Sequence, residues 1–276
     1  MNEAGNQIRN RLFSDSPTRP AGDNGTMTTG LPSEQKMPSE PKMTGNKMAE
    51  IRRSYHEQLD DLCHDVRRLG ALASEAIAAG TEALLDSDLG AADRVIGSDM
   101  FLDDLTHSIE ERSYRLLALQ QPMASDLRRL VTVLRIIHEI ERTGDLIVNV
   151  AKTTRRLYPY ELPPRIRGLI ARMGTQAGVQ LRVAMESFAE EDAARALALP
   201  DMDDVMDELQ KELFRAIFAT PDEGEAGLHR AVQIALVGRY YERIADHAVN
   251  VGHRVAYMVT GELPSSDPGL GEVSRS

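Results

Sequence analysis

Two stretches of the chain, IERTGDLIVNVAK at residues 140–152 and RYYERIADHAVNVGHRVAYMVTGE at residues 239–262, follow one pattern. Both place apolar residues at the spacing of an amphipathic helix. A shift of 101 residues superimposes them and pairs Leu127 with Leu228, Glu141 with Glu242, Arg142 with Arg243, Asp145 with Asp246 and Asn149 with Asn250. The chain therefore contains the same long helix twice.

The repeat extends upstream of these helices. A shift of 104 residues carries residues 69–109 onto 173–213 and pairs Gly70 with Gly174, Glu82 with Glu186, Asp88 with Asp192, Asp99 with Asp203, Asp103 with Asp207 and Leu105 with Leu209. Each copy is long enough for three helices. We therefore expect an all-α fold of two tandem, pseudo-repeated three-helix bundles, six long helices in all.

Short segments rich in Pro, Asp and Gly separate the helical patterns, as is typical of helix ends. They predict helices at 49–85, 89–119, 123–157, 164–189, 191–219 and 225–260. The first repeat then spans residues 48–158 and the second spans 159–262. Residues 1–47 and 263–276 are rich in small and polar residues and poor in apolar ones, so we expect both tails to be disordered.

The composition limits the possible functions. The formal net charge is -11, and residues 1–47 hold six basic and five acidic residues, so the remainder carries -12. So acidic a domain is a poor nucleic-acid binder, and its charge also repels free phosphate. The single cysteine, Cys63, excludes an internal disulfide. With no transmembrane stretch and no signal-peptide pattern, the sequence predicts a cytoplasmic protein that does not insert into membranes.

Acidic residues interrupt the apolar stripes of the helices. Glu141 and Asp145 lie on the stripe of the third helix, and Asp99 lies on that of the second helix with Asp103 beside it. If the two helices form an antiparallel hairpin, Asp103 faces Glu141 and Asp99 faces Asp145. The midpoint of each pair in the sequence is Pro122, which lies in the turn. The four carboxylates should therefore lie at one level.

The second repeat has the same arrangement. The pairs Asp207 with Glu242 and Asp203 with Asp246 both centre between Gly224 and Glu225, in the turn. Four like charges at one level require raised pKa values, neutralising basic side chains such as Arg142 and Arg243, or a bound cation. Oxygen ligands favour divalent or trivalent ions, and the candidates are Mg²⁺, Ca²⁺, Mn²⁺, iron and Zn²⁺. Asn149 and Asn250 could add an oxygen or hold a carboxylate in place.

The sequence carries no sign of enzymatic machinery. It has no phosphate-binding glycine loop of the Walker type, no dinucleotide-binding glycine pattern and no Gly-x-Ser-x-Gly. The carboxylate hairpins also lack the Glu-x-x-His pair of ferritin-like di-iron helices. We expect a protein that is not an enzyme. A di-metal carboxylate enzyme and a metal-free helical scaffold remain as alternatives.

The two opening strings, with QQPMASDLRRL at 120–130 and RRSYHEQLDDL at 52–62, resemble the PhoU family, and the resemblance covers residues 50–262. It implies paired three-helix bundles, commonly homodimeric, that bind metal ions on a carboxylate face. It also implies a negative regulator of phosphate uptake and of phosphate-starvation signalling. Such proteins connect the ATPase of a phosphate ABC transporter with a membrane sensor histidine kinase.

Carried over by position, the resemblance makes Glu141, Asp145, Glu242 and Asp246 the candidate metal ligands. The matching carboxylates of the preceding helices are Asp99, Asp103, Asp203 and Asp207. The copies differ at one position, because Leu146 follows Asp145 whereas His247 follows Asp246. The two metal sites would not be equivalent if His247 takes part in one of them.

Overall fold

A computed structural model describes residues 45–119, 122–220 and 224–262 of the chain. All of the described residues belong to one compact unit. The expected disorder of 263–276 and of nearly all of 1–47 therefore lies outside the described residues. Residues 45–47 already belong to the first helix, which begins four residues earlier than the predicted start at residue 49.

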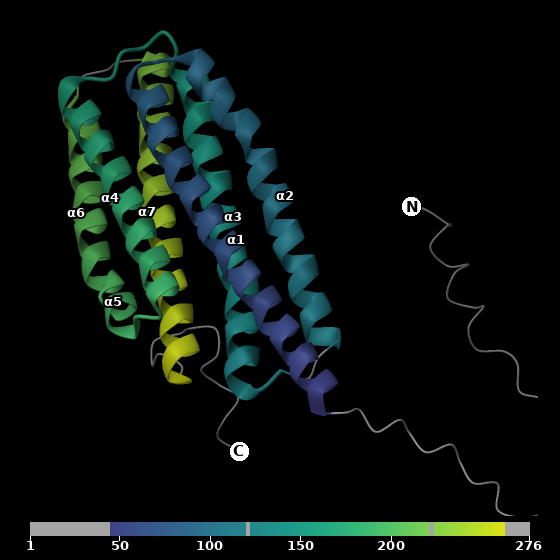
Figure 1. Ribbon diagram of the computed structural model, residues 1–276. Helices are drawn as coiled ribbons and strands as arrows, with labels where there is room; N and C mark the ends of the chain where they lie inside the picture. The colour runs from purple at the N-terminus through teal and green to yellow at the C-terminus, as the bar shows by residue number, and fades with distance from the viewer. Residues whose placement is uncertain (1–44, 120–121, 221–223, 263–276) are drawn as a thin grey trace, which may run out of the picture. The chain divides into compact units, whose positions relative to one another are not determined.

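Helices account for almost the whole described unit, and no strand occurs among the described residues (Figure 1). The helices are α1 (Gly45–Leu85), α2 (Leu89–Leu119), α3 (Ala124–Leu157), α4 (Pro164–Glu190), α5 (Ala193–Leu197), α6 (Leu199–Ala219) and α7 (Gly224–Thr260). The expected all-α fold with six long helices is confirmed. No described helix is both long enough and apolar enough to cross a membrane.

The predicted single helix at 191–219 is wrong in one respect, because the chain breaks at Ala198 into the short α5 and the long α6. Pro200 stands in the first turn of α6. Proline has no amide hydrogen and its ring crowds the carbonyl four residues earlier, so a continuous helix through it is unfavourable. Asp192 caps α5, since its carboxylate accepts a hydrogen bond of 3.0 Å from the amide of Arg195.

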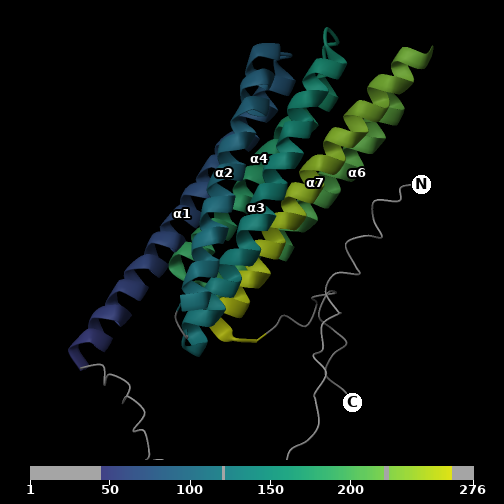
Figure 2. The ribbon, with the colours of Figure 1, turned by 90° about the vertical axis from the view of Figure 1, so that its right-hand side faces the viewer.

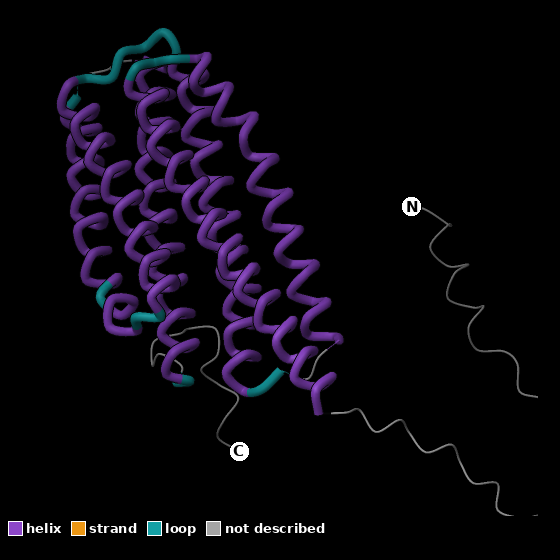
Figure 3. The backbone as a smooth tube through the Cα atoms, viewed as in Figure 1, coloured by secondary structure: helices purple, strands orange, loops and turns teal. Residues whose placement is uncertain are grey.

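The helices form two layers (Figures 1 and 2). In the first layer α2, α3, α7 and α6 lie side by side in that order, and α1 and α4 cover one side of it. Here α1 packs on α2 and α3, α4 packs on α6 and α7, and α1 and α4 pack on each other. No described helix covers the other side of the four-helix layer, which we call the open face. Loops connect the helices at the two ends of the bundle (Figure 3).

The most extensive helix contact joins α3 to α7, and these two helices are antiparallel. Arg128 donates to the carbonyl of Met258, and Thr132 donates to the carbonyl of Arg254, both at 3.4 Å. In this antiparallel register, residues of α3 and α7 that correspond in the 101-residue repeat come to face each other near Arg142 and Arg243. An approximate twofold axis that relates the two repeats therefore passes beside these two residues. The two repeats are therefore inverted relative to each other across the α3–α7 contact.

One continuous apolar core runs through both repeats. At its centre Tyr241 of α7 is fully buried, and its hydroxyl lies 2.7 Å from Thr81 Oγ1 of α1. Burial raises the pKa of Tyr241 far above its usual value, so the phenol stays neutral. The α1–α4 contact is close because α4 presents glycines: a Cβ atom on Gly174 would lie 2.5 Å from Thr81. The core thus ties α1 of the first repeat to α4 and α7 of the second.

Candidate functional site

The acidic side chains of the two central helices point to the open face. Helix α3 is flanked by α2 and α7 and covered by α1, and α7 is flanked by α3 and α6 and covered by α4. An exposed residue near the middle of either helix must therefore point away from α1 and α4. Asp145 and Asp246 are both exposed, so the two carboxylate groups lie on the same face of the molecule.

The first carboxylate group gathers as the sequence predicts. Burial raises the pKa of Asp99, and the charges of Asp103, Asp145 and Glu141 raise it further, whereas Lys152 opposes them. Burial and the charges of Glu141 and Asp145 also raise the pKa of Asp103. All four carboxylates, two from α2 and two from α3, therefore lie close enough to repel one another. We call them the first quartet.

The second quartet comprises Asp203 and Asp207 of α6 with Glu242 and Asp246 of α7. Burial raises the pKa of Asp203, whereas a hydrogen bond of 3.2 Å from Gln180 lowers it. The charges of Asp246 and Asp207 raise the pKa of Asp203 further. Burial, then the charge of Asp246, raises the pKa of Glu242. The structure thus brings all eight predicted carboxylates into two groups.

The carboxylate oxygens of the quartets are suitable ligands for a hard cation, but their positions in the structure do not form a binding site for one. Among the described residues no three Asp, Glu, His or Cys side chains converge closely enough to hold a metal ion. The Oε2 atom of Glu242 is buried and has no hydrogen-bond partner in the described part of the chain. An unpaired buried carboxylate oxygen is costly, and a cation would satisfy it. Carboxylate rotamers would have to change for three or more oxygens to meet.

Arginines neutralise the quartets only in part. Arg239 forms an ion pair with Glu242, and burial outweighs its effect on the pKa of that carboxylate. Arg142 and Arg243, the neighbours of the motif carboxylates, are exposed, and neither forms an ion pair with another described residue. Burial raises the pKa of Asp246 and the charge of Arg243 nevertheless lowers it by less, so neutralisation by arginine, one of the alternatives above, is partial.

A polar contact that the sequence did not reveal joins α3 to α7 behind the quartets. Glu139 Oε2 lies 2.7 Å from His247 Nδ1, and Asn250 Nδ2 donates to the same oxygen at 3.3 Å. Burial alone would raise the pKa of Glu139, but the hydrogen bonds and the charges of His247 and Arg142 lower it. Asn250 thus holds a carboxylate, although not one of the quartets. The replacement of Leu146 by His247 was the only signal in the sequence.

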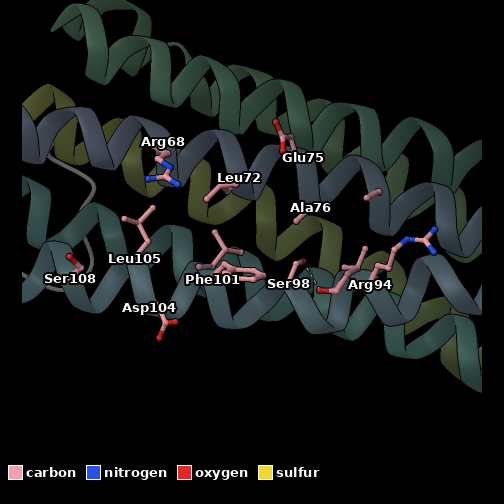
Figure 4. Close-up of a pocket in the computed structure, with 13 residues that line it drawn as sticks. Arg68, Leu72, Glu75, Ala76, Arg94, Ser98, Phe101, Asp104, Leu105 and Ser108 are labelled. Atoms are coloured by element: carbon pink, nitrogen blue, oxygen red, sulfur yellow. Dashed lines mark hydrogen bonds between the residues drawn. The ribbon is translucent and has the colours of Figure 1, made fainter.

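A second feature is a groove between α1 and α2, with a volume of about 630 Å³ (Figure 4). Leu72, Phe101 and Leu105 are among the apolar side chains that line it. In the second repeat the positions of Leu72 and Ala76 are taken by Gln176 and Gln180, which donate hydrogen bonds to α6. The groove rim carries Arg68 and Arg94 as well as Glu75 and Asp104, so its charges do not favour one kind of partner.

The fold and the site define a class: all-helical proteins built from an inverted repeat with a carboxylate quartet in each copy. The sequence model of the PhoU domain matches residues 66–154 and 170–255, one match in each repeat. The chain belongs to the PhoU family.

Curated relatives agree. The phosphate-specific transport system accessory protein PhoU homolog 1 of Mycobacterium tuberculosis is 38% identical over 79% of this chain and 98% of its own length. The PhoU homolog of Rhizobium meliloti is 31% identical over 79% of this chain and 92% of its own length. Both are similar to this chain over nearly their whole lengths.

Solved structures give the same result. The crystal structure of PhoU from Pseudomonas aeruginosa is 29% identical, with a TM-score of 0.71 over 75% of this chain and 100% of its own. The phosphate transport system regulatory protein PhoU from Streptococcus pneumoniae is 26% identical, with a TM-score of 0.70 over 76% of this chain and 99% of its own.

Proposed function

We propose that the chain is a negative regulator of phosphate uptake and of phosphate-starvation signalling that works through protein contacts and not through catalysis. The observation that carries this proposal is the match of both repeats to the PhoU family. Relatives are named as accessory or regulatory proteins of phosphate transport. The carboxylate quartets supply the binding groups for this role.

The proposed partners are the ATPase of a phosphate ABC transporter and a membrane sensor histidine kinase, which this chain connects as a cytoplasmic adaptor and a homodimer. The acidic charge of the chain favours an indirect response to phosphate, since long-range repulsion opposes the binding of a free anion. In this proposal the conformational state of the transporter carries the phosphate signal to the regulator.

Metal ions belong to the same proposal. A divalent or trivalent cation would be held by Asp99, Asp103, Glu141 and Asp145 in the first quartet. A second cation would be held by Asp203, Asp207, Glu242 and Asp246 in the second quartet. Each cation would neutralise the repulsion that raises the carboxylate pKa values and would tie the two helices of its hairpin together.

Deletion of the gene tests the regulatory role. We expect phosphate uptake and the phosphate-starvation response to become constitutive in the deletion strain, and the transporter ATPase to co-purify with the intact chain. Normal phosphate control in a strain that lacks every copy of the gene would contradict the proposal. Capture of the ATPase by an unrelated acidic helical protein serves as the control for nonspecific binding.

Elemental analysis of the purified protein tests the metal sites. Asp145→Ala combined with Asp246→Ala should remove most of the bound metal, because each substitution takes one carboxylate from a quartet. The matched control is Asp104→Ala combined with Asp204→Ala, which removes the same charge from exposed neighbouring positions. Equal metal content in both double variants, or no metal in the wild type, would show that the quartets do not hold metal.

A further inference from the structure

The α6–α7 hairpin carries a row of exposed apolar side chains on the open face. Phe214, Phe218, Leu228 and Val232 are 37%, 87%, 67% and 47% exposed. On α6 the two phenylalanines lie on the same helical face as Asp203 and Asp207, and on α7 Leu228 and Val232 share a face with Glu242 and Asp246. We call these four apolar residues the α6–α7 stripe. It begins at the hairpin tip and ends beside the second quartet.

The first repeat does not have a stripe of this kind. The positions of Phe214 and Phe218 are occupied there by Glu110 and Tyr114. These polar groups bond to one another: the hydroxyl of Tyr114 donates to Glu110 at 3.0 Å, and Glu110 lies 3.6 Å from His138. The α2 side of this face is thus polar and internally bonded in the first repeat, whereas the corresponding α6 side is apolar in the second; on the neighbouring helix both repeats are apolar, because Leu127 and Val131 correspond to Leu228 and Val232. The exposed phenylalanines Phe214 and Phe218 are therefore what is specific to the second repeat.

A cavity of about 280 Å³ adjoins the stripe at the hairpin tip. Phe218 and Leu228 line it, together with Ile217 and Ile234. A cavity of this size accepts one or two apolar side chains from another molecule. Contiguous exposed apolar surface on an otherwise charged protein commonly marks a binding surface.

We propose that the α6–α7 stripe and the second quartet together bind a basic amphipathic helix of a partner protein. The apolar residues of this helix would cover the stripe, and its lysines or arginines would reach the carboxylates in place of the cation proposed for the second quartet. From Leu228 to Asp246 the surface follows 18 residues of α7, or about 27 Å at 1.5 Å per residue. The partner helix therefore has about 18 residues, apolar in one half and basic in the other.

The charge of the surface distinguishes this partner from two other occupants. An anionic membrane would be repelled by the quartet beside the stripe and by the net charge of the chain. A second copy of the chain would bring further carboxylates to a place that attracts cations. Neither occupant compensates the four acidic side chains, whereas a basic helix does so as it covers the apolar ones.

The test uses the full chain and two labelled peptides. The basic peptide has leucines along one stripe of its first half and arginines along the same stripe of its second half; the control peptide has glutamates in place of the arginines. We expect fluorescence anisotropy to show binding of the basic peptide alone, weakened by added salt. Phe218→Ser with Leu228→Ser should weaken binding by about tenfold or more, a loss of about 1.4 kcal/mol.

The matched control is Tyr114→Ser with Leu127→Ser, which changes the corresponding exposed positions of the first repeat and should leave peptide binding unchanged. Equal affinity for the two peptides, or equal losses in the two double variants, would overturn the proposal. If the wild type is a dimer and the Phe218→Ser, Leu228→Ser variant dissociates without peptide, the stripe binds a second copy and the proposal is wrong. If the wild type floats with anionic vesicles and this variant does not, the stripe binds a membrane and the proposal is wrong.

The inference rests on the proposed role as an adaptor, and the two can fail separately. Suppose that the Phe218→Ser, Leu228→Ser variant captures the transporter ATPase and restores phosphate control in the deletion strain as well as the wild type does, while the basic peptide does not bind. The proposed docking surface is then wrong and the regulatory role stands. If the peptide binds as expected but deletion of the gene leaves phosphate control normal, the surface stands and the regulatory role is wrong.

Discussion

Glu139 lies at the contact between α3 and α7 and accepts hydrogen bonds from both His247 and Asn250. The other ring nitrogen of His247, Nε2, is buried and has no hydrogen-bond partner within the described ranges. The imidazole therefore depends on Glu139 for its polar contact. This one carboxylate thus bonds to the buried His247 and the half-buried Asn250 of the opposite repeat, close to the twofold axis.

Replacing Glu139 separates the effect of its shape from that of its hydrogen-bonding oxygens. Glu139→Ala leaves His247 and Asn250 without their acceptor in a buried contact, so we expect the free energy of unfolding to fall by about 2–4 kcal/mol. Glu139→Gln keeps an acceptor oxygen at the same distance and should cost about 1 kcal/mol or less. Urea unfolding measures both. Equal stability of the two variants would mean that the contact contributes little.

At the scale of elements, glycines set the distance between α1 and α4. A Cβ atom on Gly174 would lie 2.5–3.0 Å from atoms of Thr81, whose hydroxyl also bonds to Ile77 and Tyr241. Threonine is stiff at χ1 and held by these bonds, so it cannot move aside cheaply. One turn further along the same helix, a Cβ atom on Gly178 would meet only Ile77, at the ordinary distance of 3.9 Å.

These two glycines give a matched pair of substitutions. Gly174→Ala should lower the free energy of unfolding by about 1–3 kcal/mol, because overpacking outweighs the better helix propensity of alanine. Gly178→Ala should raise it by up to about 1 kcal/mol, since the same gain in propensity comes without a clash. Thermal or urea unfolding decides the signs. A Gly174→Ala variant as stable as Gly178→Ala would show that α1 and α4 separate easily.

The sequence predicted the helices and the heights of the carboxylates along them better than it predicted contacts between side chains of different helices. Helix positions and the heights of the carboxylates follow from a fixed rise per residue and from the turns, so Asp99, Asp103, Glu141 and Asp145 were correctly brought together. The break at Ala198 depends on one proline inside an otherwise helical pattern. The pairing of Glu139 with His247 depends on how α7 packs against α3, and no local pattern contains that information.

At the scale of the whole molecule, the repeats are joined by extensive contacts. The largest helix contact, α3 with α7, and the α1–α4 contact both cross from one repeat to the other. The boundary expected between residues 158 and 159 therefore separates two stretches of sequence whose helices share one core. Each repeat covers an apolar face of the other.

A fragment that contains the first repeat alone tests this dependence. Residues 45–158 would expose the sides of α1 and α3 that α4 and α7 cover in the intact chain, and they would leave Glu139 without its partners. We expect the fragment to show no cooperative thermal unfolding by circular dichroism, or to associate in light scattering. A monomeric fragment that unfolds cooperatively would show that a single repeat is an independent domain.

The inverted packing also bears on the order in which the halves are encoded. The start of α1 and the end of α7 lie at one end of the helical bundle, and the loop of residues 158–163 lies at the other (Figure 1). A circularly permuted gene could join Glu262 to Gly45 through a linker and open the chain within that loop. Every helix would keep its neighbours although the second half would be translated first. The fold thus constrains which helices meet far more than it constrains the sequence of their synthesis.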